Sequence, residues 1–319
     1  MSFNILIIGA GQLGSRYLQG FVGSESELNI TVVDPSRESL EIASARWIEA
    51  GGDGSSHQIR WMQSLPSDFD EIDIAFIITS SKGRADVVRN LADKTKVRYW
   101  VLEKVLAQSN SELVKICSSV TNSSGAWVNT PRRMMRWHAE LKEIFTGNGP
   151  LNVTYSAGHW GLACNSIHFI DLVAWWSGEA LVSVDTTALD HNWFESKRAG
   201  YFEITGELVA HFSDGTSLRL SSMEGAQAKP IRVALNDGVV WGVDESAGTA
   251  HSSNGERVLG RLEFQSQLSC SLVDEILQRG ECDLPSLNES APMHAIFLEA
   301  MLAHWNRSQN RNDDFVPIT

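Results

Sequence analysis

Along the first part of the chain, short apolar runs alternate with segments in which apolar residues recur at helical spacing. Few polar residues interrupt the runs, as in parallel strands that are covered on both faces. The expected strands are Ile5–Ile8, Ile30–Val33, Ile72–Ile78, Trp100–Leu102 and Trp127–Asn129. The expected helices between them are Gln12–Val22, Glu38–Glu49, Arg84–Lys94 and Ser111–Ser119. This alternation predicts an α/β domain built on a doubly wound parallel sheet.

After Asn129 the pattern changes to strands that alternate between apolar and polar residues. Such alternation is typical of antiparallel strands with one face in the core and one toward solvent. The expected strands are Tyr201–Leu208, Leu208–Phe212, Ser217–Ser221, Ile231–Leu235 and Val239–Val243, and the expected helices are Arg133–Phe145, Ser166–Trp176, Leu272–Arg279 and Ala291–Trp305. Asp214-Gly215 and Asn236-Asp237-Gly238 lie between strands, as hairpin turns do. We expect two domains, 1–128 and 129–319, the second an α+β domain with an open, mostly antiparallel sheet.

Composition argues against several classes of protein. The chain has 319 residues, with 39 acidic and 26 basic side chains, and its net charge of −13 is not offset by any run of Lys or Arg. We therefore expect no nucleic-acid partner. No apolar stretch approaches the roughly 18 residues of a membrane span, and the N-terminus does not resemble a signal peptide. These features predict a cytoplasmic protein without a membrane partner.

Cysteine and tryptophan usage adds two expectations. The four cysteines are far apart and form no CxxC pair, which indicates a reduced compartment and argues against a disulfide framework or a zinc site. No metal is therefore expected. The chain also has eleven tryptophans against four tyrosines. Tryptophan suits a core, an oligomer interface or a sugar-binding pocket, and composition does not choose among them.

A glycine-rich loop follows the first strand. Gly9-Ala10-Gly11-Gln12-Leu13-Gly14 is a complete GxGxxG that opens the first helix. In such a loop the first glycine permits a tight turn, the second lets a pyrophosphate approach the backbone, and the third lets the helix pack closely on the strand. The N-terminus of the helix adds amide donors and the positive end of its dipole. The expected dinucleotide contacts are Gly9, Gly11, Gln12, Leu13 and Gly14; the alternative is a glycine turn without a ligand.

An acidic residue stands where the ribose of such a dinucleotide would lie. Asp34 ends the second strand, 20 residues beyond Gly14, and a carboxylate there can accept both ribose hydroxyls. Asp34 also repels a 2′-phosphate, which favours NAD over NADP. Ser36 and Arg37 keep NADP open, because an arginine at this turn can receive the additional phosphate. NAD is the expected cofactor, with Arg37 as a further contact.

These features together resemble the Gfo/Idh/MocA family, named after glucose-fructose oxidoreductase and inositol dehydrogenase. The resemblance spans nearly the whole chain and rests on the GxGxxG loop, Asp34, Thr79-Ser80-Ser81, Glu103-Lys104, and Trp160-Gly161 followed by His168 and Asp171. It implies a Rossmann domain for the nicotinamide cofactor and a second domain whose helices form one wall of a sugar pocket. It also implies a homodimer or homotetramer formed through the sheet of the second domain.

The resemblance assigns the loop after the third expected strand to the cofactor. Thr79, Ser80 and Ser81 correspond to the family's Thr-Pro-Asn, which touches the cofactor. Arg84 stands where a histidine is common in the family.

The resemblance also implies the reacting groups. Glu103-Lys104-Val105 corresponds to the family's Glu-Lys-Pro, so Glu103 would orient or contact the nicotinamide and Lys104 would hydrogen-bond the reacting oxygen. Val105 replaces the proline. The family's Asp-x-x-x-His maps onto Cys164 and His168, so the histidine is kept and its acidic partner is not.

The chemistry of hydride transfer gives these residues roles. Oxidation of a secondary alcohol needs a base for the hydroxyl proton, and reduction needs the matching acid. His168 titrates nearest neutrality and is expected to move that proton; the alternative is a core histidine. Lys104 is expected to polarise the oxygen, with a surface lysine as the alternative. Asp171 lies three residues after His168 on the same expected helix, close enough to interact, while Cys164 is either a weak partner or a small buried residue.

Residues near the domain boundary are candidates for binding substrate. Arg132, Arg133 and Arg136 cluster in an otherwise acidic chain, and guanidinium groups suit carboxylate or phosphate. An acidic or nucleotide-linked sugar would explain the cluster, and ion pairs with Glu140 and Glu143 would explain it equally well. The substrate-binding candidates are Lys104, Arg132, Arg133, Trp160, Cys164, Asn165 and His168.

The sequence therefore favours an NAD(P)-dependent dehydrogenase or reductase that acts on CH–OH groups of a sugar or sugar derivative. A cofactor-binding sensor or regulator that has lost catalysis is the alternative, because Val105 and Cys164 depart from the family pattern. A hydrolase that uses tightly bound NAD, as occurs among relatives of this family, is a third hypothesis.

Overall fold

The computed structural model describes residues 2–66 and 71–319. The chain divides into two compact units, and each is described by itself. The first unit comprises Met1–Leu106, Val114–Pro131 and Glu263–Leu287. The second comprises Ala107–Leu113, Arg132–Leu262 and Asn288–Thr319. Glu263–Leu287 thus belongs by its contacts to the first unit, whereas the expected boundary after residue 128 places this segment in the second domain.

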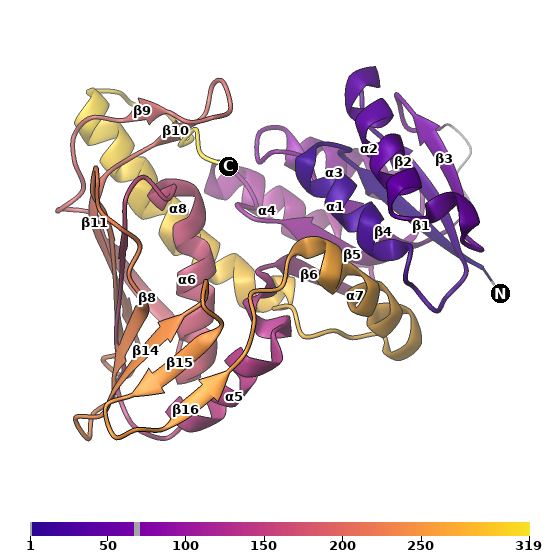
Figure 1. Cartoon of the computed structure of the whole chain (residues 1–319). Coiled ribbons are helices and arrows are strands. Elements are labelled where there is room, and N and C mark those ends of the chain that lie inside the picture. The colour runs from indigo at the N-terminus through magenta and orange to yellow at the C-terminus, as the bar shows by residue number, and fades with distance from the viewer. Residues whose placement is uncertain (1, 67–70) are drawn as a thin grey trace. The chain divides into compact units, whose positions relative to one another are not determined.

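Within the described residues, the first unit contains a six-stranded parallel sheet (Figure 1). Its strands are β1 (Phe3–Ile8), β2 (Leu28–Val33), β3 (Gln58–Met62), β4 (Ile72–Ile77), β5 (Val97–Glu103) and β6 (Gly125–Asn129). The order β3-β2-β1-β4-β5-β6, parallel throughout, confirms the predicted doubly wound sheet. Ile7 and Phe76 on the two central strands are fully buried, which explains the apolar runs. The edge strand β3 was not expected, because its sequence QIRWM is half polar.

The helices that follow the strands of this sheet agree with expectation to within a few residues. They are α1 (Gln12–Phe21), α2 (Arg37–Glu49), α3 (Arg84–Ala92) and α4 (Asn110–Ser119), and a 3-10 turn, Gly52–Gly54, follows α2.

Another helix, α7 (Gln265–Arg279), comes from the last fifth of the chain and packs on α1. Gly20 on α1 permits the close approach, because a Cβ there would lie 2.7 Å from the Cβ of Ser269. The Asp274 carboxylate accepts hydrogen bonds from Ser24 Oγ at 2.6 Å and from the backbone N–H of Glu25 at 3.0 Å. These contacts are the reason why α7 belongs to the first unit.

The second unit, as far as it is described, contains an eight-stranded sheet in the order β16-β15-β14-β13-β7-β12-β11-β8 (Figure 1). The strands are β7 (Asn152–Ala157), β8 (Leu181–Asp185), β11 (Gly206–Phe212), β12 (Ser217–Ser222), β13 (Ile231–Ala234), β14 (Val240–Asp244), β15 (Thr249–Ser252) and β16 (Arg257–Leu259). Every neighbouring pair is antiparallel except β7 with β12, which confirms the open, mostly antiparallel sheet. The hairpins expected at Asp214-Gly215 and Asn236–Gly238 join β11 to β12 and β13 to β14.

Several elements of the second unit differ from expectation. Strands β7, β8, β15 and β16 were not expected, and the strand expected over Tyr201–Leu208 is broken. Within that range β10 (Phe202–Glu203) pairs with β9 (Phe194–Glu195), and β11 begins separately at Gly206, whose φ is 101°. A left-handed residue of this kind interrupts a regular ladder.

The helices of the second unit are α5 (Arg136–Phe145), α6 (Leu162–Ser177) and α8 (Leu287–Gln309). A 3-10 turn, Pro131–Met134, replaces the start of the helix expected from Arg133. Helix α6 begins before the expected Ser166, directly after Gly161, whose φ is 79°. This earlier start brings Cys164 and Asn165 onto the same helix as His168.

Tryptophan supplies much of both cores. Trp47 and Trp100 in the first unit, and Trp176 and Trp241 in the second, are fully buried. The high tryptophan content is thus largely explained by core packing. Among residues 2–66 and 71–319, no helix is long and apolar enough to cross a membrane.

Candidate active site

Two of the three glycines in the loop after β1 are required by packing. Gly9 has a φ of 106°, and a Cβ there would lie 2.7 Å from the carbonyl oxygen of Ile78. A Cβ on Gly14 would lie 1.9 Å from the carbonyl oxygen of Gly9, so only glycine lets α1 approach the turn. A Cβ on Gly11 would meet nothing within 4 Å. Gly11 is therefore not required by packing, and its bare backbone leaves room for a phosphate at the N-terminus of α1.

Asp34 connects this loop to the end of β2. Its Oδ2 accepts a hydrogen bond from the backbone N–H of Ala10 at 2.7 Å, and its Oδ1 accepts one from Ser36 at 2.8 Å. A carboxylate oxygen has lone pairs for more than one donor, so ribose hydroxyls can still bind. Arg37, at the start of α2, pairs with Glu41 at 2.9 Å, and both side chains are exposed.

The loop after β4 carries Thr79, Ser80 and Ser81 at the carboxyl end of the sheet. In a doubly wound sheet this end faces the ligand crevice. The hydroxyl of Thr79 is buried, and it has no hydrogen-bond partner among the described residues. A buried hydroxyl normally finds a partner, so this atom suits a contact with a bound cofactor. The loop therefore fits a dinucleotide on an observation independent of the glycine motif.

Glu103 ends β5 and is held inside the first unit. Its Oε1 accepts hydrogen bonds from Tyr17 Oη at 3.0 Å and from Asn129 Nδ2 at 2.7 Å, and the same Asn129 nitrogen donates to Gln265 Oε1 at 2.8 Å. Burial raises the pKa of Glu103, while Asn129, Arg84 and Lys104 act in the opposite direction. Glu103 thus ties β5 to α1, β6 and α7.

Lys104 follows Glu103 directly, at the carboxyl end of β5. Its side chain is half-buried, and the peptide bond from Lys104 to Val105 is cis. Because β1, β4 and β5 are parallel, Lys104 lies at the same end of the sheet as the glycine loop and Thr79.

In the second unit, His168 lies on α6 one turn after Cys164 and is half-buried. A carboxylate from strand β10 lies at the N-terminus of α6. Glu203 of β10 accepts hydrogen bonds from the backbone N–H groups of Ala163 at 2.8 Å and Cys164 at 3.2 Å. Glu203 was not among the expected site residues, because no sequence motif links β10 to α6. Asn165 donates to the carbonyl of Trp160 at 2.8 Å, which holds the turn before α6.

Asp171, expected as a neighbour of His168, has a cationic partner. Its carboxylate accepts two hydrogen bonds from Arg133, at 2.6 Å from Nη2 and 3.1 Å from Nε, and both side chains are less than a tenth exposed. Arg133 also reaches Glu289 at 3.3 Å.

The other arginines of the cluster are paired as well. Arg132 donates from Nε and Nη2 to Glu245 at 2.6 and 2.8 Å, and His138 Nε2 lies 3.1 Å from the same carboxylate. Arg132 and its hydrogen bonds hold the pKa of Glu245 far below its usual value despite burial, while burial lowers the pKa of His138. The exposed Arg136 pairs with Glu140 at 3.4 Å. Of the ion pairs expected with Glu140 and Glu143, the structure shows Arg136 with Glu140, whereas Arg132 and Arg133 pair with acids distant in sequence.

Trp160 lies against the aromatic rings of Tyr155 and Phe169, with ring centroids 5.2 and 5.3 Å away. Its indole nitrogen donates to the carbonyl of Ser221 at 3.0 Å. The polar atom of Trp160 is thus engaged within the second unit, and its ring face is what it can offer a sugar.

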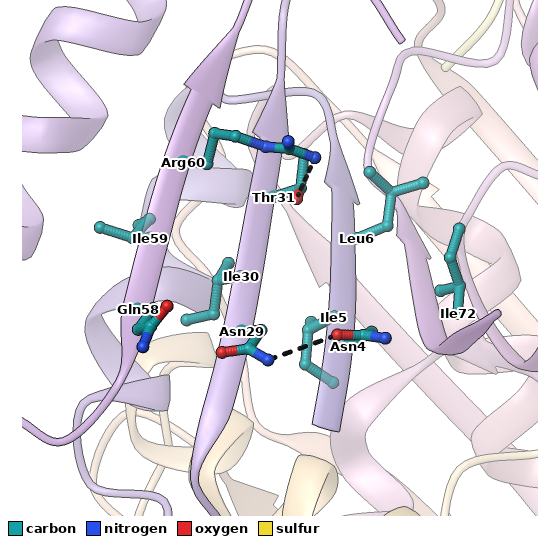
Figure 2. Close-up of a pocket in the computed structure, with 10 residues that line it drawn as sticks. All are labelled: Asn4, Ile5, Leu6, Asn29, Ile30, Thr31, Gln58, Ile59, Arg60 and Ile72. Carbon is teal, nitrogen blue, oxygen red and sulfur yellow. Dashed lines mark hydrogen bonds between the residues drawn. The ribbon is translucent and has the colours of Figure 1, made fainter. Parts of the chain in front are cut away.

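Each unit also has a hollow that is lined by other residues. One, of about 410 Å³, is formed by Asn4, Asn29, Gln58, Arg60 and neighbours on β1 to β4 (Figure 2). Asn4, Asn29 and Gln58 are register partners toward the amino ends of their strands, opposite the end that carries Gly9 and Asp34. The other, of about 540 Å³, lies on strands β7 and β12 to β14 and includes Lys229 and Arg232. Neither is lined by a predicted site residue.

Comparison with known proteins places the chain by its fold. No family model matches its sequence, and no curated protein matches it. Solved structures do. The UDP-N-acetylglucosamine 3-dehydrogenase of Acidithiobacillus ferrooxidans is 16% identical, with a TM-score of 0.70 over 97% of this chain and 100% of that one. The myo-inositol dehydrogenase of Lactobacillus casei, solved with NAD(H) and myo-inositol, is 18% identical, with a TM-score of 0.65 over 98% and 96%.

An oxidoreductase from Agrobacterium radiobacter, solved with NAD+, L-tartaric acid and magnesium, is 12% identical, with a TM-score of 0.69 over 96% of each chain. These likenesses cover both units. They show that the chain has the fold of the Gfo/Idh/MocA dehydrogenases, a Rossmann domain followed by an α+β domain with an open sheet, as the sequence resemblance implied.

Proposed function

We propose that this protein is an NAD-dependent oxidoreductase that transfers a hydride between nicotinamide and the hydroxyl or carbonyl carbon of a sugar or sugar derivative. The observation that carries the proposal is the loop after β1. Gly9 and Gly14 are required there by packing, whereas Gly11 meets nothing within 4 Å. Asp34, whose carboxylate accepts a hydrogen bond from this loop, supports the proposal as an acid that can bind ribose hydroxyls. The fold shared with sugar and inositol dehydrogenases points to the same chemistry.

The residues of this chain then take the following roles. A nicotinamide cofactor, when bound, supplies the acceptor or donor of the hydride. Lys104 hydrogen-bonds the substrate oxygen and stabilises the negative charge that develops on it. His168 accepts the hydroxyl proton in oxidation and returns it in reduction. Glu103, held by Tyr17 and Asn129, fixes the end of the strand from which Lys104 extends.

The arginine pairs bear on the substrate. The guanidinium groups of Arg132 and Arg133 already donate hydrogen bonds to Glu245 and Asp171, so they are poorly available to bind an anionic substrate. This arrangement favours a neutral sugar or polyol over an acidic or nucleotide-linked sugar. The homodimer or homotetramer implied by the resemblance stays a prediction.

Cofactor titration and turnover test the proposal. We expect NAD+ to change the intrinsic tryptophan fluorescence at lower concentration than NADP+, and tighter binding of NADP+ would contradict the NAD assignment. NADH formation is then measured over polyols, neutral sugars, sugar acids and nucleotide sugars. Replacing Lys104 or His168 by Ala should lower kcat by about 10²- to 10⁴-fold, the usual contribution of such groups. The exposed Lys115 and His251 provide matched Ala controls that should leave kcat unchanged.

The alternatives have their own outcomes in the same experiment. Turnover that survives both substitutions would refute the assigned residues. Cofactor binding without turnover on any substrate would favour a sensor or regulatory protein. Bound NAD that does not exchange with added cofactor would favour a hydrolase.

A further inference from the structure

Arg84 is the first residue of α3, and its side chain is buried, at 1% exposure. Its guanidinium group donates to four backbone carbonyls. Nη1 donates to the carbonyl oxygens of Glu103 at 2.5 Å, of Val105, and of Leu106 at 3.2 Å, and Nη2 donates to the carbonyl oxygen of Thr79. One buried side chain thus binds two loops, the one after β4 and the one after β5.

A buried cation is costly unless its donors are satisfied, so its presence needs an explanation. The planar guanidinium fork presents several N–H groups in fixed directions, which suits carbonyls that converge from two loops. A lysine has a single ammonium on a flexible stem and cannot bind the same carbonyls together. These four carbonyls therefore require the planar shape of the arginine side chain as well as its positive charge.

The carbonyls that Arg84 binds enclose Lys104. Nη1 binds the carbonyl of the residue before Lys104 and that of the residue after it. Nη2 binds Thr79, whose hydroxyl is the buried group without a partner among the described residues. The backbone that presents Lys104 and the backbone that presents Thr79 are therefore held to the same rigid group.

We infer that Arg84 is a positioning residue: it fixes the backbone on both sides of Lys104 relative to the loop of Thr79, and so sets the direction in which Lys104 meets the reacting oxygen. The expected effect on catalysis rests on the proposed function, whereas the fixing of the two loops by Arg84 does not depend on it. Arg84 touches neither substrate nor cofactor in this role. Its loss should lower the rate of the chemical step more than the affinity for the cofactor.

The first test measures the loops directly, by amide hydrogen exchange of the segment 103–107 in wild type, Arg84→Lys and Arg84→Met. Arg84→Lys keeps the charge and provides a folded variant if Arg84→Met is too unstable. The control is Arg89→Met on the same helix, where Arg89 forms an exposed ion pair with Asp86. We expect the amides of residues 103–107 to exchange faster in the Arg84 variants than in wild type. In the control Arg89→Met they should exchange at the wild-type rate. Unchanged exchange in Arg84→Lys would overturn the inference, whether or not the protein is an enzyme.

The second test separates positioning from a merely structural role. With folded Arg84→Lys, we expect kcat to fall about 100-fold, as for a misplacement of a reacting group by about 1 Å, while the Kd for NAD+ stays within about threefold. Equal losses in both quantities, or a kcat that falls only with the folded fraction, would overturn the positioning role. If wild type shows no turnover on any substrate, the proposed function fails while the exchange experiment still decides the locking of the loops.

Discussion

Asp171 and Arg133 form a buried ion pair in which each side chain satisfies the other. Asp171 is 2% exposed and Arg133 8%, and two hydrogen bonds join them. Replacing one member leaves a buried charge without its main partner, which costs far more than an exposed pair contributes. Glu203 is a comparable case, because its buried carboxylate satisfies two amides at the first turn of α6. Two buried acids thus bind α6 or its neighbours, and of these Asp171 was singled out from the sequence whereas Glu203 belongs to no motif.

We predict that Asp171→Ala lowers the free energy of unfolding by about 3–5 kcal/mol, since Arg133 then remains buried and underpaired. Urea unfolding measures the change. Glu140→Ala is the matched control: its pair with Arg136 is exposed and should contribute less than about 1 kcal/mol. Similar losses in the two variants would contradict a special role for the buried pair.

The turn from β1 into α1 shows how a motif divides between structure and binding. Gly14 is required because α1 passes close to the carbonyl of Gly9, whereas Gly11 has open space around its Cα. The backbone of Gly11, with φ −64° and ψ −163°, is one that any residue can adopt. The same motif thus contains two glycines needed by the fold, Gly9 and Gly14, and one, Gly11, that is available for a ligand.

We predict opposite effects of two alanine substitutions in this turn. Gly14→Ala should cost about 1–3 kcal/mol of stability or more, because its Cβ would meet backbone that cannot move aside. Gly11→Ala should leave the melting temperature unchanged but weaken NAD+ binding by about tenfold or more, equivalent to about 1.4 kcal/mol. Thermal unfolding and fluorescence titration of both variants measure the two effects. Full NAD+ affinity in Gly11→Ala would contradict the phosphate site.

For the whole molecule, buried titratable groups link stability to pH. Burial lowers the pKa of His138 and of His304, so the unfolded chain takes up their protons at a higher pH than the folded chain does. Acid therefore favours unfolding from about pH 6.5 downward. Glu245 is held ionised in the folded chain and adds a loss of stability below its usual pKa of 4.5. Glu103 acts in the opposite direction, because its pKa is raised by burial.

We predict that the free energy of unfolding falls between pH 7.5 and 5.5, with one histidine contributing at most about 1.4 kcal/mol per pH unit. Urea titrations at several pH values measure the slope. His138→Gln should make the slope shallower, because it removes one of the protons that only the unfolded chain binds. The exposed His251 gives the control His251→Gln, which should follow wild type. A slope unaffected by His138→Gln would contradict the assignment.

Much of the first unit could be predicted from local patterns. The apolar runs, the helices between them and the GxGxxG turn are properties of neighbouring residues, and the structure confirms them. Strand β7 was missed although it lies in the middle of its sheet and NVTYSA alternates polar and apolar residues. Its place depends on pairing with β12 and β13, which follow it by more than 50 residues.

By itself, the sequence determined the alternation of strands and helices in most of the first unit and the GxGxxG turn followed by Asp34, since these depend on spacing over a few residues. The candidates Lys104 and His168 came from the resemblance to the family. Only the tertiary structure decided that α7 packs on α1, that Arg133 binds Asp171, that Glu203 stands at the start of α6 and that Arg84 holds the backbone around Lys104. The reason is physical. A buried charge must find its partners wherever the fold brings them, and those partners lie tens of residues away along the chain.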